Sequence, residues 1–151
     1  DPTVLLHARI DHGRRIIRLD EVCYKTGMLN DDIAETMRRE GISRTTPVYA
    51  DCAEPKTIAE LPRAGYNVLP CYKATLKAEQ LQAIKGYAIH VTKRSLNVIK
   101  ELRNYSWAKD KNGQMLNEPI SINDHAMDAM RYAVFQAIAG RQAGKYNIKF
   151  V

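Results

Sequence analysis

The chain has 151 residues, of which 45% are hydrophobic and 26% charged, and its 23 Lys+Arg against 17 Asp+Glu give a formal charge of +6. This composition excludes disordered, collagen-like and coiled-coil proteins and is typical of one globular domain. No apolar run reaches the roughly 18–20 residues that cross a bilayer, so we expect no contact with a membrane. The positive charge favours a polyanionic partner, although many proteins of this charge bind none.

Two β-rich segments, residues 4–10 and 15–22, flank an Asp-His-Gly-Arg turn and predict a β-hairpin. Helices and strands are then expected to alternate. The expected elements are a helix over 31–40 that Asn30 caps, a strand over 47–51, a helix over 55–64 that Gly65 stops, a strand over 67–72, a helix over 78–87, a strand over 88–92, a helix that Ser95 caps, a solvated turn over 109–113, a last helix over 123–140 and a short strand over 146–151. This order predicts a three-layer α/β domain with a mixed sheet flanked by helices.

Three cysteines, Cys23, Cys52 and Cys71, are spread along the chain without a Cys-x-x-Cys pair or a Cys/His ligand spacing. An odd number at such spacing predicts neither a disulfide framework nor a zinc site. We therefore expect a protein of a reducing cytoplasm.

Asp51 is the first candidate for a functional residue, because it ends an apolar strand at the point where ligand sites of open α/β sheets collect. An equally weighted alternative is that Asp51 only caps the turn before the next helix. Glu54, three residues on, would support a metal ligand if a metal is present. Without a metal, Glu54 is better explained as a first-turn acid that the helix dipole favours.

The start of the last helix carries the second candidate group, Asp124, His125 and Asp128, within its first turn and a half. Spacings of three and four residues place such side chains on one helical face. Carboxylates suit Mg²⁺ and Mn²⁺, and an imidazole can bind Mn²⁺ or orient a water molecule. Helix capping would also explain Asp124. A solvated acid explains Asp128 poorly, because its neighbours in the helix are small and apolar.

Four basic residues, Lys73, Lys77, Lys93 and Arg94, follow predicted strands. If these strand ends gather on the carboxylate side, the four side chains would contact DNA phosphates without reading base sequence. For any single one of them, a solvated surface position is an equal alternative.

Three motifs resemble the C-terminal nuclease domain of the large terminase subunit of tailed bacteriophages. They are Ala-Asp-Cys-Ala-Glu-Pro-Lys at 50–56, Glu-Leu-Arg-Asn-Tyr at 101–105 and Asn-Asp-His-Ala-Met-Asp-Ala-Met-Arg-Tyr at 123–132. Asp-Pro-Thr at 1–3 and Gly-Tyr-Asn-Val-Leu-Pro at 65–70 resemble that family as well. The resemblance covers nearly the whole chain.

The resemblance implies a ribonuclease H-like fold and a divalent-metal-dependent endodeoxyribonuclease. Such a domain cuts concatemeric viral DNA during genome packaging by two-metal phosphodiester hydrolysis, with two Mg²⁺ or Mn²⁺ ions. Asp51, Asp128 and His125 match the catalytic and metal-binding positions, and Asp124 matches a frequent acid that supports them. The active-site lysine of the family corresponds to Lys73 or Lys77, and the lack of a glycine between them leaves the choice open.

The resemblance also implies double-stranded DNA, a small terminase subunit and a portal protein as partners, in the cytoplasm of an infected bacterial host or from a prophage. The chain has no Gly-x-x-x-x-Gly-Lys-Ser/Thr phosphate loop, so an ATPase domain is expected upstream in the same polypeptide. In the family, an Asp-aromatic-Gly motif on the central strand precedes Asp-Pro-Thr. We therefore expect residues 1–151 to form the nuclease domain, with its first strand upstream of residue 1.

Two other functions stay open from the sequence. The domain could be a non-catalytic DNA-binding or docking module of the packaging motor, since one acid of the family pattern is not in the chain. It could also be another ribonuclease H-like nuclease, such as a junction resolvase. The motif at 123–132 argues against the latter by resemblance alone.

Overall fold

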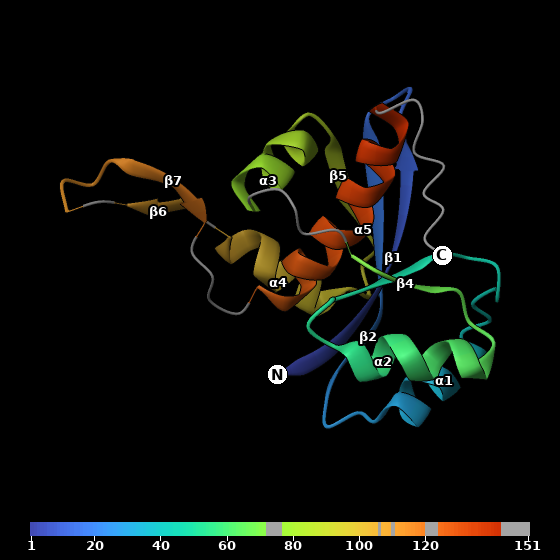
Figure 1. The fold of residues 1–151 in the computed structure, drawn as a ribbon. Helices are drawn as coiled ribbons and strands as arrows, with labels where there is room; N and C mark the ends of the chain where they lie inside the picture. Colours follow the sequence, from blue (N-terminus) through green and yellow to red (C-terminus); the bar gives the residue numbers. More distant parts are fainter. Residues whose placement is uncertain (72–76, 106, 110, 120–123, 143–151) are drawn as a thin grey trace.

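The computed structural model describes residues 1–71, 77–105, 107–109, 111–119 and 124–142 (Figure 1). Its first two strands, β1 (Pro2–Asp11) and β2 (Ile16–Thr26), form a long antiparallel hairpin. The tight turn between them is held by the Asp11 carboxylate, which accepts a hydrogen bond from the Arg14 backbone N–H at 2.9 Å. The predicted hairpin is confirmed: β1 extends beyond its predicted range at both ends, whereas β2 begins one residue later than predicted and ends beyond the predicted range.

The hairpin is part of a mixed sheet, because β5 (Ala88–Val91) pairs with β2 in parallel, giving the order β1-β2-β5. A second parallel pair is formed by β3 (Val48–Ala50) and β4 (Val68–Pro70). The antiparallel pair β6 (Trp107–Lys109) and β7 (Met115–Pro119) forms an arm that projects from the body of the domain (Figure 1).

Helices cover both faces of the β1-β2-β5 sheet. The helices are α1 (Asn30–Arg39), α2 (Pro55–Glu60), the 3-10 turn η1 (Leu61–Ala64), α3 (Lys77–Lys85), α4 (Leu96–Asn104) and α5 (His125–Gln142). On one face, α3, α4 and α5 pack on β2 through a core that includes Leu19, Ile84, Val98 and Val134. On the other face, Met37 of α1 and the η1 segment pack with Leu5 of β1. The predicted three-layer α/β architecture with a mixed sheet is confirmed.

Two of the predicted helix caps are wrong in detail. Asn30 is the first residue of α1 rather than its cap, and its side chain hydrogen-bonds Thr57 and Glu60 of α2 instead. Asp32 accepts the N–H of the cap residue Leu29 at 2.8 Å.

Ser95 does occupy the cap position of α4, but its hydroxyl accepts the N–H of Glu21 at 2.8 Å and makes no capping bond. The Glu21 carboxylate caps α4 in its place, because it accepts the N–H groups of Asn97 and Val98, each at 3.0 Å.

The remaining differences concern element boundaries. The predicted helix over 55–64 is α2 followed by η1, where Pro62 lacks the N–H that a continuing α-helix would use. Gly65 then ends the segment with a left-handed φ of 94°, as predicted. The turn over 109–113 carries the unpredicted strands β6 and β7 on its flanks. The strand predicted over 146–151 lies outside the described residues.

In the described part of the chain, no helix has the length and apolarity that spanning a membrane requires.

Candidate active site

The beginning of α5 holds a group of paired charges that centres on Lys77 of α3. Its Nζ lies 2.5 Å from Asp124 Oδ2 and 3.2 Å from Asp128 Oδ1. The same Asp128 Oδ1 accepts a hydrogen bond from Nη2 of the buried Arg131 at 3.0 Å, and Arg131 also donates to Gln80. Two carboxylates and two cationic groups, Lys77 and Arg131, thus form one charge-balanced cluster at the start of α5.

Asp51 lies directly after β3 and reaches the same helix from the other side. Its Oδ2 accepts a hydrogen bond from the Tyr132 hydroxyl at 3.2 Å, and its Oδ1 accepts the backbone N–H of Ala53 at 2.9 Å. Tyr132 follows Asp128 by four residues, which places the two side chains on one face of α5. The structure therefore places Asp51 beside Tyr132, which lies one helical turn along α5 from Asp128.

Glu101 of α4 fixes the start of α5. Its Oε2 accepts the backbone N–H groups of Ala126 at 2.7 Å and Met127 at 3.1 Å, and its Oε1 accepts the Tyr24 hydroxyl at 2.9 Å. Burial, together with this hydrogen bond to Glu101, raises the pKa of Tyr24 to about 12. A buried carboxylate at a helix N-terminus satisfies free N–H groups and complements the helix dipole. Glu101 thus sets the position of the helix that carries Asp128.

Sequence reasoning assigned no role to Glu101, although the chain carries a signal for it. Val98, Glu101 and Tyr105 follow one another at helical spacing on the inward face of α4. A charged residue on an otherwise apolar face is expected to have a buried partner. The partner itself, the free N–H groups of α5, depends on tertiary packing.

Tyr105 lies near enough to the acids for their charges to affect its pKa. Burial raises the pKa of Tyr105 to about 12, and the nearby charges of Asp124 and Asp128 add to the shift. Its hydroxyl has no hydrogen-bond partner among the described residues. The acids at the start of α5 therefore lie against a partly apolar wall, where their charges interact more strongly than in water.

The other predicted site residues are distributed as follows. His125 is the half-buried first residue of α5, and its ring makes no hydrogen bond or ion pair within the described part of the chain. Glu54 is exposed at the start of α2, where its backbone N–H donates to the Asp51 carbonyl at 2.9 Å.

Lys93 is exposed after β5. Arg94 holds Asp20 of β2 at 2.5 Å and, with Thr92, lowers the pKa of Asp20 to about 2. Lys73 lies outside the described residues.

A groove of about 710 Å³ separates β1 from β3. Its walls include Leu6 of β1 and Val48 of β3, and α5 lines it with the small residues Ala129, Ala133 and Ala137. Among the described strands, β1 pairs only with β2 and β3 only with β4, so both edges that face the groove lack a strand partner. The groove is therefore bordered both by β3, which ends next to Asp51, and by α5, which carries Asp128.

A mixed sheet between helical layers, with one acid at a strand end and others on the last helix, is the arrangement of a ribonuclease H-like domain. The family described as "Terminase RNAseH like domain" matches residues 1–136. This chain belongs to that family.

Known relatives agree with this assignment. The chain is 32% identical over 127 residues to the PBSX phage terminase large subunit of Bacillus subtilis (strain 168). The aligned residues make up 83% of this chain and 29% of the relative. The chain thus spans less than a third of the length of that relative.

Solved structures establish the same fold. The nuclease domain of the g2p large terminase from bacteriophage SPP1, crystallised with bound Mn, superposes with a TM-score of 0.78 at 21% identity, covering 91% of this chain and 80% of that domain. The large terminase of a thermophilic bacteriophage gives a TM-score of 0.70 at 18% identity, over 90% of this chain and 36% of its own.

Proposed function

We propose that this domain is a divalent-metal-dependent DNA endonuclease that cuts concatemeric viral DNA during genome packaging. The observation that carries the proposal is the hydrogen bond between Tyr132 and Asp51, which ties the acid at the end of β3 to the helix that carries Asp128 one turn earlier. Acids brought together from a strand end and a helix are the donor set that two hard cations need.

The charges around these acids fit metal ions. Asp124 and Asp128 already enclose a cation, the Lys77 ammonium group, and their carboxylate oxygens are the ligands that Mg²⁺ and Mn²⁺ prefer. We assign Asp51 and Asp128 as metal ligands and His125 as a ligand or as the group that orients the attacking water. Asp124 and Glu54 would support these ligands. When bound, two such ions activate water and stabilise the leaving oxygen of a phosphodiester.

The surrounding residues position the acids and the substrate. Glu101 holds the first turn of α5, and Tyr132 holds Asp51, so both carboxylates have fixed directions before DNA binds. Lys73, Lys77, Lys93 and Arg94 are assigned to the DNA backbone, which predicts cleavage with little sequence preference.

We also propose that a β-strand from upstream in the polypeptide lies in the groove between β1 and β3. The groove is bordered by two strand edges and lined by three alanines of α5, which leaves room for a backbone between the walls. Unpaired edges are normally covered. By resemblance, this strand carries the Asp-aromatic-Gly motif and a third acid, which would complete the nuclease domain. Addition of the preceding segment to residues 1–151 is expected to raise both the thermal midpoint and the nuclease activity. If it changes neither, the groove is not the place of that strand.

The whole protein is proposed to be a large terminase subunit in the host cytoplasm, encoded by a phage or prophage. An ATPase domain on the same polypeptide is supported by the greater length of the large terminases and by the complex of one of them with ATP-gamma-S. Double-stranded DNA is the proposed substrate. A small terminase subunit and a portal protein are the further partners that this assignment implies.

A second candidate is a non-catalytic DNA-binding or docking module. The specific observation in its favour is that Lys77 and Arg131 together balance the charges of Asp124 and Asp128, the second of which a metal would use. In that case DNA binding would persist without any metal.

The decisive experiment is cleavage of a supercoiled plasmid by the full-length protein in Mn²⁺, Mg²⁺ or EDTA. We expect cleavage in either metal and none in EDTA. Asp51→Asn and Asp128→Asn should each lower the rate by more than about a hundredfold, since loss of a few kcal/mol of charge stabilisation has that effect. Asp31→Asn, an exposed acid on α1, is the matched control. Metal-independent DNA binding without cleavage would favour the docking module, and an active Asp128→Asn variant would remove Asp128 from the site.

A further inference from the structure

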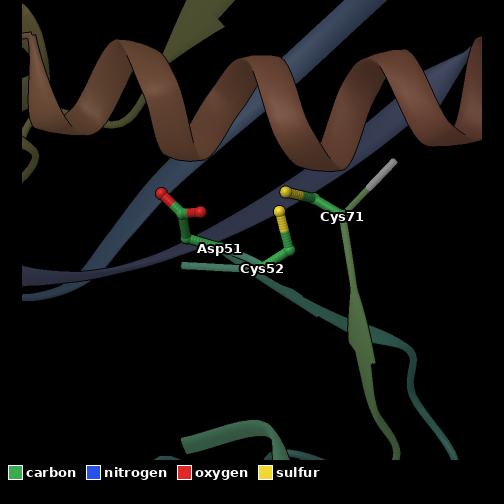
Figure 2. Close-up of side chains that lie close together, drawn as sticks. All are labelled: Asp51, Cys52 and Cys71. Atoms are coloured by element: carbon green, nitrogen blue, oxygen red, sulfur yellow. The ribbon is translucent and has the colours of Figure 1, made fainter. Parts of the chain in front are cut away.

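Two cysteines lie beside Asp51 at the ends of neighbouring strands. β3 and β4 are parallel with Ala50 opposite Pro70, and the Cys71 N–H donates to the Ala50 carbonyl at 2.8 Å. Asp51 and Cys52 follow β3, and Cys71 follows β4, so the three side chains emerge at one edge. Figure 2 shows the two thiols turned towards each other beneath α5, with the Asp51 carboxylate beside them.

The geometry of these three side chains is close to that of a metal site. A carboxylate oxygen of Asp51 and the two Sγ atoms all lie within 4.8 Å of one another. A tetrahedral ion with bonds of about 2.0–2.3 Å places its ligand atoms roughly 3.5–3.8 Å apart. Cys71 is buried, whereas Cys52 is exposed and can rotate to close the set.

The ligand types select the ion. Sulfur ligands favour Zn²⁺ and similar soft ions, whereas Mg²⁺ and Mn²⁺ prefer oxygen ligands. Two sulfurs and one carboxylate leave a fourth tetrahedral position for solvent, as in three-ligand zinc sites. The hydrogen bonds from Ala53 and Tyr132 orient the carboxylate, as partners of a metal ligand commonly do.

We propose that Asp51, Cys52 and Cys71 form a Zn²⁺ site that shares Asp51 with the nuclease centre. Zinc bound there engages the Asp51 carboxylate and thereby inhibits cleavage in Mg²⁺ or Mn²⁺. The inhibition rests on the proposed function, but zinc binding does not. The spacing of the cysteines along the chain does not indicate such a site, because Cys52 and Cys71 meet only through the pairing of β3 with β4.

Cobalt(II) is a suitable probe, because thiolate ligands give it an intense charge-transfer band in the near ultraviolet. The full-length protein with reduced thiols would be titrated with Co²⁺ and then with Zn²⁺. We expect a band that Zn²⁺ abolishes and that Cys52→Ser and Cys71→Ser each weaken, because each removes one of the two thiolate ligands. Asp51→Asn should weaken Co²⁺ binding by more than about tenfold, since even loss of a supporting partner costs about 10–100-fold.

Cys23→Ser is the matched control, because Cys23 lies on β2 with its thiol 3.4 Å from the Met28 sulfur, outside the proposed site. The cobalt band of Cys23→Ser should be as strong as that of the wild type. Cys71 is buried, so its variant needs a check of folding by circular dichroism, but the exposed Cys52 tests the site without that difficulty. A band that is unchanged in Cys52→Ser would overturn the proposal.

The second measurement is the Zn²⁺ concentration that halves the Mn²⁺-supported cleavage rate, with each variant normalised to its own rate without Zn²⁺. Cys52→Ser should raise this concentration by more than about tenfold relative to the wild type. A cobalt band without any nuclease activity would contradict the proposed function and leave the zinc site standing. Nuclease activity without the band would contradict the zinc site alone.

Discussion

The carboxylates Asp128 and Asp51 belong to two differently built parts of the molecule. Asp128 lies on a long helix whose first turn is held by buried Glu101 and whose body packs in the main core. Asp51 follows a strand of three residues, beside a helix, α2, with no buried residue. The Tyr132 hydroxyl of α5 links the two parts through its hydrogen bond to Asp51, and the groove lies between β1 and β3. Asp128 is thus held in place by the main core. Asp51 depends on a few contacts and on what occupies the groove.

Removal of Glu101 should have the largest effect on the helix side. Glu101→Ala leaves two backbone N–H groups and the Tyr24 hydroxyl without their acceptor. Loss of charge-assisted hydrogen bonds in a buried setting predicts a fall of about 3–4 kcal/mol in the free energy of unfolding. Urea denaturation measures it, with the exposed Glu35→Ala as a control that should change little. A loss as small as the control's would mean that Glu101 does not hold α5.

Removal of the Lys77 charge should have an intermediate effect. In Lys77→Gln, Asp124 and Asp128 face each other without the ammonium group between them, which predicts a loss of about 1–2 kcal/mol. Mn²⁺ should then raise the thermal midpoint more in this variant than in the wild type, since metal binding relieves that repulsion. Equal shifts in both proteins would indicate that the metal does not use these acids.

Tyr132→Phe tests the link between the two parts. It removes the hydrogen bond to Asp51 at 3.2 Å and leaves the ring in place, so we expect a loss of only about 1 kcal/mol in stability. Cleavage should fall by about tenfold, because one ligand loses its fixed direction. Chemical denaturation and plasmid cleavage measured on the same preparation separate the two effects. Unchanged cleavage would show that the Asp51 side is held by other contacts.

The smallest effect is expected at the ion pair between Asp20 and the exposed Arg94, because ion pairs at the surface contribute little to stability. The folded-state pKa of Asp20 is lowered from 3.8 to about 2, mainly by the hydrogen bond from the Arg94 side chain. Because the pKa is lower in the folded state, ionised Asp20 stabilises the fold at pH values above its unfolded-state pKa. This contribution is lost as the pH falls from about 4 to about 2. The gap in thermal midpoint between wild type and Arg94→Ala should therefore exist at pH 6 and close towards pH 2. A constant gap would exclude this ion pair as its cause.

Sequence patterns predicted the elements whose signals are local. The hairpin follows from β-formers around a turn, the end of η1 from Gly65, and the position of Asp51 from an apolar strand ending in an acid. The pairing of Asp128 with Lys77 and the roles of Glu21 and Glu101 were not predictable, because each partner comes from a distant element. β6 and β7 were missed because they are short and bind mainly each other.

The two long-range caps have a consequence for folding. The N–H groups at the start of α4 are satisfied by Glu21 of β2, and those at the start of α5 by Glu101 of α4. The hydrogen bonds of α4 are therefore complete only when β2 is in place, and those of α5 only when α4 is in place. β2, α4 and α5 should therefore open as one cooperative unit rather than fray from their helix ends. The amide protons of Val98 and Met127 would then exchange with solvent only when that whole unit opens.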